Sequence, residues 1–268
     1  MLKAVARTLL VHLGYYPPGR QVRVYDDDVF LVSYPKSGST WLRFLIANLK
    51  GAQDRVDFTN VDQVIPDIYQ DVEKKLQALK RPRIIKSHEY FEPRYQKVIY
   101  VVRDPRDVAV SYYYHHIKQR LIPNDLRIEE FVDPFLAGTL DPYGSWQDHV
   151  GGWCRARTDR TDFLLLRYED LSRFAEEELR RVAEFLRLEV TRTQLRAALE
   201  RCSFEEMRRL EQRQAHLNER LRGSRQEILF IRSATVGGWR REMPTAAAER
   251  ITGAWSGTMA EYGYGDEV

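Results

Sequence analysis

Cysteine and net charge are both scarce in this sequence. Only two cysteines, Cys154 and Cys202, occur in 268 residues, and their spacing fits no metal-binding motif. Two cysteines are also too few to frame a secreted disulfide scaffold, so we expect reduced thiols in a cytoplasmic protein. The 42 basic residues nearly balance the 39 acidic ones, which leaves a formal net charge of +3. This balance does not require a polyanion-binding face, and we expect no nucleic acid partner.

A long hydrophobic run and an internal repeat are missing as well. The uncharged residues near the N-terminus form a run too short to span a bilayer, without a small-residue cleavage site. We therefore expect a surface helix over residues 1–13 and no transmembrane segment. Hydrophobic residues make up 43% of the chain and charged residues 30%, which is typical of a globular protein. The length suits one large domain over residues 1–268 rather than two small ones.

Short apolar runs alternate along the chain with longer amphipathic ones, which is the pattern of an α/β fold. Because the short runs are continuously apolar, they predict a parallel sheet flanked by helices on both faces. The expected strands cover residues 29–33, 83–86, 98–102 and 163–168. The expected helices cover residues 41–49, 105–121, 143–158, 172–187 and 191–212, with a last helix from about Pro244.

The turn between the first strand and its helix has the composition of a phosphate site. Residues 34–40 place a glycine, Gly38, and a mobile positive charge, Lys36, just before a helix N-terminus, where backbone N–H groups are unpaired. Three hydroxyl side chains add donors: Ser37, Ser39 and Thr40. The alternative is a plain Pro/Gly turn with capping hydroxyls. The turn is not a Walker A loop, because the lysine precedes the glycine and no leading glycine exists.

The segment Tyr34-Pro35-Lys36-Ser37-Gly38-Ser39-Thr40-Trp41 resembles the 5′-phosphosulfate loop of cytosolic sulfotransferases, Tyr-Pro-Lys-Ser-Gly-Thr-Thr-Trp. Only the residue at Ser39 differs, and it keeps the hydroxyl. The resemblance implies a P-loop-like nucleotide-binding (sulfotransferase) fold and transfer of a sulfuryl group from 3′-phosphoadenosine-5′-phosphosulfate (PAPS) to an acceptor hydroxyl. Adenosine 3′,5′-bisphosphate (PAP) is then the second product. The whole segment from Lys36 to Trp41 would bind the donor, and no metal is expected.

Residues 98–113 are similar to the family segment that holds the 3′-phosphate. The resemblance assigns that phosphate to Arg103, at a strand end, and to Ser111, about two turns into the next helix. Taken alone, Arg103 could instead form a salt bridge to Asp107, and Ser111 could be a small helix-packing residue.

An adenine slot is implied by two further family-like segments. Tyr168-Glu169-Asp170 resembles a turn whose tyrosine faces the base, and Cys202-Ser203-Phe204 resembles a segment whose phenylalanine packs on it. Trp41 would complete the slot with Tyr168 and Phe204. As single residues, all three could be ordinary core aromatics. Cys202 stands where the family usually has threonine.

The segment from 230 to 240 departs most from the family pattern Phe-x-Arg-Lys-Gly-x-x-Gly-Asp-Trp-Lys. Arg232 is kept as a 3′-phosphate ligand, but Ser233-Ala234 replaces Lys-Gly. One cation is therefore missing, and alanine allows less backbone freedom than glycine, so the loop could take another path. Arg103 and Arg232 would then bind the 3′-phosphate, helped by Arg240 or Arg241. The family's dimerisation motif is not evident, which leaves the oligomeric state open.

Catalysis is assigned to Lys86-Ser87-His88, which resembles the family's Lys-x-His segment. His88 is the expected general base, because an imidazole suits proton transfer near neutral pH. Lys36 would stabilise the leaving phosphate and Lys86 the transferring sulfuryl oxygens. Other histidines that could serve as the base are His149 and, less favoured on a helix, His115 and His116.

The acceptor pocket would be lined by residues 51–80, 88–95, 112–150 and 212–230, with 212–230 as a lid. These segments could admit a phenol, an alcohol, a lipid or a sugar. Two other functions compete with sulfuryl transfer: an ATP-dependent kinase and a non-catalytic nucleotide-binding protein.

Overall fold

A parallel sheet lies at the centre of the molecule. The computed structural model describes residues 22–50, 55–69, 76–218 and 221–265, so the helix expected over residues 1–13 lies outside the described residues. Within the described ranges the sheet has four strands, β1 (Val29–Ser33), β2 (Ile84–Ser87), β3 (Lys97–Val102) and β4 (Phe163–Arg167). Their order is β2-β1-β3-β4 and every pairing is parallel. The expected fold class is therefore confirmed.

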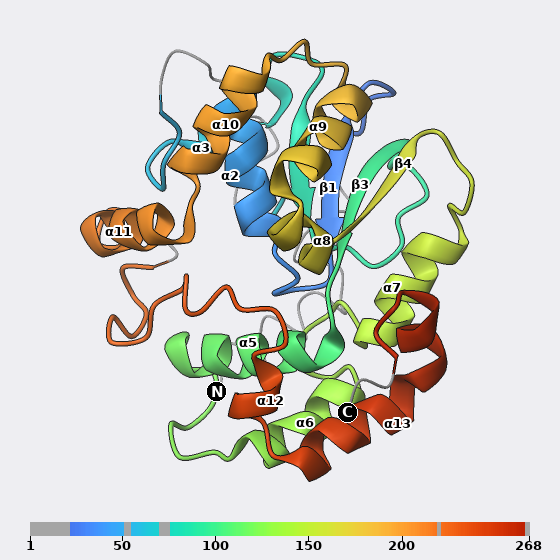
Figure 1. Ribbon diagram of the computed structural model, residues 1–268, viewed down its shortest axis with the longest axis vertical. Helices are drawn as coiled ribbons and strands as arrows, with labels where there is room; N and C mark the ends of the chain where they lie inside the picture. Colours follow the sequence, from blue (N-terminus) through green and yellow to red (C-terminus); the bar gives the residue numbers. More distant parts are fainter. Residues whose placement is uncertain (1–21, 51–54, 70–75, 219–220, 266–268) are drawn as a thin grey trace.

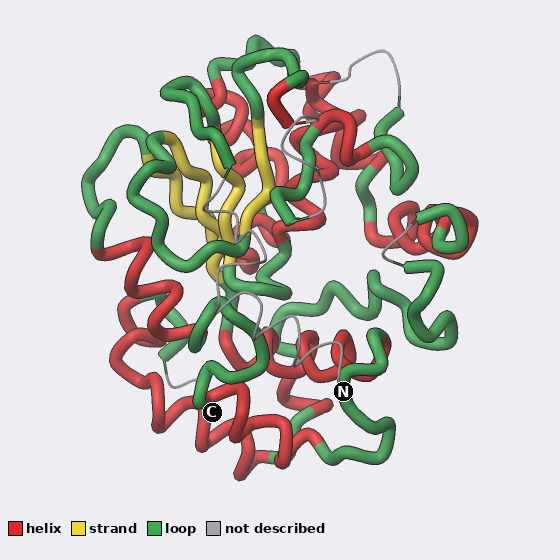
Figure 2. Tube along the Cα trace, turned by 180° about the vertical axis from the view of Figure 1, so that it is seen from behind, coloured by secondary structure: helices red, strands yellow, loops and turns green. Residues whose placement is uncertain are grey.

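Helices cover both faces of the sheet (Figures 1 and 2). Side chains alternate along β1, so Phe30 and Val32 belong to one core cluster while Val29 and Leu31 belong to the other. The first cluster packs under α5 (Pro105–Lys118), α6 (Ile128–Leu136), α7 (Trp146–Arg155) and α13 (Thr245–Glu261). The second packs under α2 (Ser39–Lys50), α9 (Ala175–Leu186) and α10 (Arg192–Arg201). This double burial explains why the strands are continuously apolar.

Local capping signals set several helix starts. Asp104 accepts from the backbone N–H of Arg106 ahead of α5, where Pro105 occupies the first turn. Ser145 caps α7 in the same way through Asp148. The remaining described helices are α3 (Val61–Val64), α8 (Tyr168–Arg173), α11 (Phe204–Gln214) and α12 (Trp239–Glu242).

Two expected helices are each divided in the structure. The helix expected over 191–212 is α10 and α11, because Ser203 leaves the helical conformation and its side chain caps the backbone N–H of Glu206. The helix expected over 172–187 is preceded by α8 and begins again at Ala175 after a break at Phe174. The helices expected over 105–121 and 143–158 are shorter, and the sequence reasoning missed α6.

The carboxyl ends of the four parallel strands meet at one edge of the sheet. The turn 34–40 follows β1, His88 follows β2, Arg103 follows β3, and Tyr168 follows β4. Each strand thus delivers one predicted site segment to the same edge, which is where ligands bind in open α/β sheets. Over the described parts of the chain, no helix combines the length and apolar character that crossing a membrane requires.

Candidate active site

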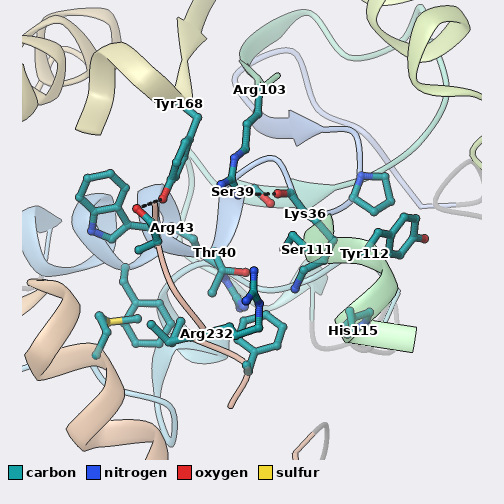
Figure 3. Close-up of a pocket in the computed structure, with 18 of the residues that line it drawn as sticks. Lys36, Ser39, Thr40, Arg43, Arg103, Ser111, Tyr112, His115, Tyr168 and Arg232 are labelled. Atoms are coloured by element: carbon teal, nitrogen blue, oxygen red, sulfur yellow. Dashed lines mark hydrogen bonds between the residues drawn. The ribbon is translucent and has the colours of Figure 1, made fainter. Parts of the chain in front are cut away.

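A cavity of about 750 Å³ opens at the carboxyl edge of the sheet. Every residue that the sequence assigned to the site lines this cavity except Ser37, which is buried beside it. The site residues come from all four strand ends and from α2, α5 and α11, together with Arg232 from the segment before α12. Figure 3 shows Lys36, Arg103, Tyr168 and Arg232 around the cavity.

The turn after β1 has two residues in the left-handed region, Lys36 at φ 67° and Gly38 at φ 98°. A Cβ at Gly38 would lie 2.4 Å from Cδ2 of Tyr168, so only glycine fits without displacing that ring. The helix α2 begins at Ser39, which directs its N-terminus at the cavity. The Ser37 hydroxyl is buried and has no hydrogen-bond partner among the described residues.

The Lys36 ammonium lies 4.0 Å from the ring centroid of Phe230, in a cation–π contact. Burial, followed by the charges of Lys86 and Arg103, lowers the pKa of Lys36 to about 7. An anion bound beside these three cations would reverse the repulsion and hold the lysine charged.

Lys86 forms a buried ion pair with Asp67, with 2.8 Å between Nζ and Oδ2. Asp67 also makes an isolated parallel bridge to Lys86 through the backbone, which fixes the two residues side by side. The ion pair therefore fixes the position of the Lys86 ammonium at the cavity.

His88 is oriented by its backbone and its ring. Its Nδ1 lies 2.7 Å from the carbonyl oxygen of Ser33, which can only accept, so Nδ1 carries the proton and Nε2 keeps a lone pair. The backbone N–H donates to the Tyr69 hydroxyl at 2.9 Å, and the two rings stack in parallel. Burial, then the charge of Lys86, lowers the pKa of His88 well below its usual value. The imidazole is therefore neutral at physiological pH.

The other candidate histidines differ from His88 in their contacts. His149 is fully buried, with Nδ1 accepting from the Tyr100 hydroxyl at 2.8 Å and Nε2 donating to the His88 carbonyl at 3.1 Å. Both of its ring nitrogens are thus used inside the protein, where they support the turn that carries His88. His116 donates to the Tyr112 carbonyl, whereas His115 lines the cavity.

Arg103 lies at the boundary between the turn and the aromatic slot. Its guanidinium carbon is 4.2 Å from the Tyr168 ring centroid, and its Nη2 donates to the Thr235 carbonyl and lies 3.7 Å from Asp107. Its Nε is buried without a hydrogen-bond partner in the described part of the chain. The salt bridge considered from the sequence therefore exists and still leaves a donor unused.

Three aromatic residues form the other end of the cavity. Trp41 and Tyr168 pack edge to face with ring centroids 6.0 Å apart, and Phe204 lines the same cavity. The Trp41 indole N–H donates to the Cys202 carbonyl at 2.9 Å, so its ring is fixed in place. A flat apolar slot with a polar edge suits a purine base.

In the segment before α12, a residue other than glycine adopts the left-handed conformation. Ala234 has φ 51°, a conformation that costs alanine about 1 kcal/mol. The Tyr168 hydroxyl donates to its carbonyl, and Asp107 accepts the backbone N–H groups of Gly237 and Trp239. These contacts hold the segment against the site and offset the cost of the alanine.

Residues 225–230 of the expected lid, and Ile231 directly after them, are attached to α5 and α11. Lys118 Nζ donates to the carbonyls of Arg225 and Ile228, and the Glu211 carboxylate accepts the backbone N–H groups of Phe230 and Ile231. This anchoring places Phe230 over Lys36. That the segment acts as a lid remains a prediction.

The residues present fit a bisphosphorylated nucleotide. The unpartnered Ser37 hydroxyl and Arg103 Nε, the turn that only glycine completes, and the aromatic slot supply donors and surfaces for phosphates and a base. In the described residues no group of three or more His, Cys, Asp or Glu side chains is placed to hold a metal ion.

The sequence reasoning missed Asp67, Phe230 and Glu242 as members of the site. Phe230 stood inside the aligned segment, so its position was visible but its contact with Lys36 was not. Asp67 and Glu242 are single carboxylates outside the family-like motifs, and only the fold shows that they pair with Lys86 and Arg232.

Comparisons with known proteins identify relatives over nearly the whole chain. A family model described as "Sulfotransferase domain" matches residues 26–263. Sulfotransferase 1E1 of Rattus norvegicus is 30% identical over 84% of this chain and 81% of its own length. The 3-beta-hydroxysteroid sulfotransferase of Cavia porcellus is 30% identical over 91% and 88%. The crystal structure of mouse sulfotransferase SULT7A1 complexed with PAP is similar with a TM-score of 0.73 and 26% identity, over 96% of this chain and 90% of that one.

Proposed function

Because the chain belongs to the sulfotransferase domain family, we propose a specific form of its reaction, in which His88 is the general base and a small-molecule hydroxyl is the acceptor. The protein is a PAPS-dependent sulfotransferase, as the family and the relative solved with PAP show. The roles of individual residues, the acceptor class and the expected cytoplasmic location are the parts that we propose.

The observation that carries the proposal is the orientation of His88. The Ser33 carbonyl fixes the proton on Nδ1, so Nε2 is left to accept a proton from an attacking hydroxyl. His88 lines the cavity together with Lys36 and Lys86. The neutral imidazole can take the proton, and the two lysine charges favour the alkoxide that forms as the hydroxyl loses it.

Sulfuryl transfer resembles phosphoryl transfer in needing alignment and charge stabilisation. Lys86, held by Asp67, would face the oxygens of the moving sulfuryl group. Lys36 would face the bridging oxygen that gains charge when the leaving phosphate departs. The residues from Ser37 to Thr40, with the N-terminus of α2, would hold the 5′-phosphate.

The proposed donor site ends in the aromatic slot and the 3′-phosphate ligands. Trp41, Tyr168 and Phe204 would enclose the adenine. Arg103, Ser111 and Arg232 would hold the 3′-phosphate. Because Arg103 stacks on Tyr168, the proposed subsites for the base and for this phosphate are adjacent. The contribution of Arg240 or Arg241 in place of the missing lysine stays a prediction.

Replacing Gly38 by alanine is expected to weaken PAP binding at least about tenfold. The new Cβ would lie 2.4 Å from Tyr168 at a backbone angle that strains alanine by about 1–3 kcal/mol, so the turn or the ring must move. Titration calorimetry with PAP measures the loss. Gly253→Ala on α13 is the matched control, because beyond its own helical turn no atom lies within 4 Å of the added Cβ. An unchanged PAP dissociation constant for Gly38→Ala would show that the turn does not shape the donor site.

Replacing Arg103 by alanine is expected to weaken PAP binding about ten- to a hundredfold, which is the range for losing charge-assisted hydrogen bonds. Adenosine 5′-phosphate should lose only a few-fold, because it has no 3′-phosphate. Titration calorimetry with both nucleotides makes the comparison on one variant. Equal losses for the two nucleotides would contradict the 3′-phosphate assignment.

We propose a small-molecule acceptor with a phenolic or aliphatic hydroxyl. The relative from Cavia porcellus is named for a 3-beta-hydroxysteroid, which supports an alcohol of this kind. Around His88 the cavity wall is formed by Tyr69 and Tyr143, whose rings suit a flat acceptor. A lipid or a sugar hydroxyl remains an alternative acceptor for the same base.

The function is tested by an acceptor screen with radiolabelled PAPS against phenols, aliphatic alcohols and glycans. The expected result is labelled product with at least one acceptor class, together with PAP binding that needs no magnesium. Binding of ATP with magnesium in preference to PAP would instead favour a kinase. PAP binding without product from any acceptor class would favour a non-catalytic role.

A further inference from the structure

Arg232, an arginine of the proposed 3′-phosphate site, is already paired with a carboxylate inside the cavity. Its Nη1 and Nη2 both donate to Glu242, with 3.0 Å between Nη2 and Oε1. The two side chains are 27% and 21% exposed, and both line the cavity. A negative charge therefore lies where a phosphate is expected to bind.

The pairing uses the atoms that a phosphate would use. A guanidinium holds a carboxylate or a phosphate through the same fork of terminal nitrogens, so the two anions exclude each other at Arg232. Arg103 differs, because its carboxylate partner Asp107 is fixed by the backbone N–H groups of Gly237 and Trp239. Asp107 is therefore part of the scaffold, whereas Glu242 competes for the ligand.

The guanidinium of Arg232 is already in position for a ligand. Its central carbon lies 4.2 Å from the Tyr114 ring centroid, and Arg232 and Ser111 line one small side cavity. Figure 3 shows Arg232 extending toward Ser111 and Thr40. When a nucleotide binds, its phosphate therefore has to replace the Glu242 carboxylate at Arg232, whereas the arginine itself needs to move little.

The sequence of the segment makes this competition consequential. Ser233-Ala234 supplies no cation where the resembling family has lysine, while Glu242 adds an anion. With a 3′-phosphate bound, the displaced carboxylate would remain near a like charge.

We propose that Glu242 is a specificity-determining residue that competes with the 3′-phosphate for Arg232 and so weakens the hold on PAP. The inference rests on the proposed function, because it requires a 3′-phosphate at Arg232. The enzyme then releases its nucleotide product more readily than the two arginines alone would allow.

The test is titration calorimetry of PAP and of adenosine 5′-phosphate with the full chain and with Glu242→Gln. The amide keeps the shape of the side chain and removes its charge. PAP should bind about tenfold more tightly to Glu242→Gln, and adenosine 5′-phosphate should bind unchanged, since only PAP has the competing phosphate. In an Arg232→Ala background, the same substitution should change PAP binding by less than about twofold.

Glu176→Gln is the matched control, because Glu176 is 20% exposed and ion-paired with Arg180, Arg192 and Arg196 on the α9–α10 surface. It should leave both nucleotides unaffected. Weaker or unchanged PAP binding by Glu242→Gln overturns the proposal while the proposed function stands. Failure of PAP to bind the unaltered chain overturns both.

Discussion

Replacing His88 by alanine is expected to lower the turnover number by about a thousandfold or more, the upper part of the range for losing a general base. The acceptor hydroxyl would have no group to take its proton, because both nitrogens of the nearby His149 are engaged within the protein. The Ser33 carbonyl and the Tyr69 hydroxyl lie outside the proposed donor site, so PAP binding should persist. Single-turnover assays with labelled PAPS, combined with PAP titration, separate the two effects.

The control is His216→Ala, because His216 is exposed in the turn after α11 and does not line the cavity. It should have the turnover of the unaltered chain. Activity of His88→Ala within a few-fold of the unaltered chain would rule out His88 as the base. The pH profile adds a check: because the pKa of His88 is lowered, protonation of its imidazole should reduce activity only at a pH well below the usual histidine value of about 6.5.

Replacing Lys36 by methionine is expected to lower the rate of the chemical step by about 100- to 1,000-fold. The leaving phosphate would gain charge with no cation at its bridging oxygen, while the methionine side chain can keep the apolar contact with Phe230. The substitution removes a poorly solvated charge, so the melting temperature should not fall. Rapid-quench measurement of a single turnover checks the rate.

The matched control is Lys97→Met. Lys97 also lies over a phenylalanine ring, 4.7 Å from the centroid of Phe185, but it does not line the cavity. Its turnover should be unaffected. A rate for Lys36→Met equal to that of Lys97→Met would exclude Lys36 from the chemistry.

The strands were predictable because each is buried on both faces of the sheet and is therefore continuously apolar in sequence. Their bounds agree with the structure to within a residue, and the α/β class, the family and the enzyme class are confirmed. The single helix expected over 191–212 was wrong, because the structure has two helices there, α10 and α11, which are separated at Ser203. The cap at Ser203, which divides it, acts through one hydroxyl.

Residues at strand ends could be proposed for the site from the sequence, because the change from a strand to a turn is visible in a few neighbouring residues. The carboxylates Asp67 and Glu242 could not, because their significance depends on partners 19 and 10 residues away in the chain. Ion pairs of that kind produce no periodic pattern in the sequence. The roles of the individual site residues remain predictions to be tested by the substitutions above.

The strand order β2-β1-β3-β4 has a consequence for how the enzyme becomes active during folding. The proposed site takes residues from the end of each strand, and the fourth strand begins more than 130 residues after the start of the first. A slip of one residue in β2 would turn His88 to the opposite face. Such long-range parallel pairing is slow, so the site is completed only when all four strands have paired in the correct register. Recovery of activity is therefore a strict measure of correct register, stricter than recovery of secondary structure.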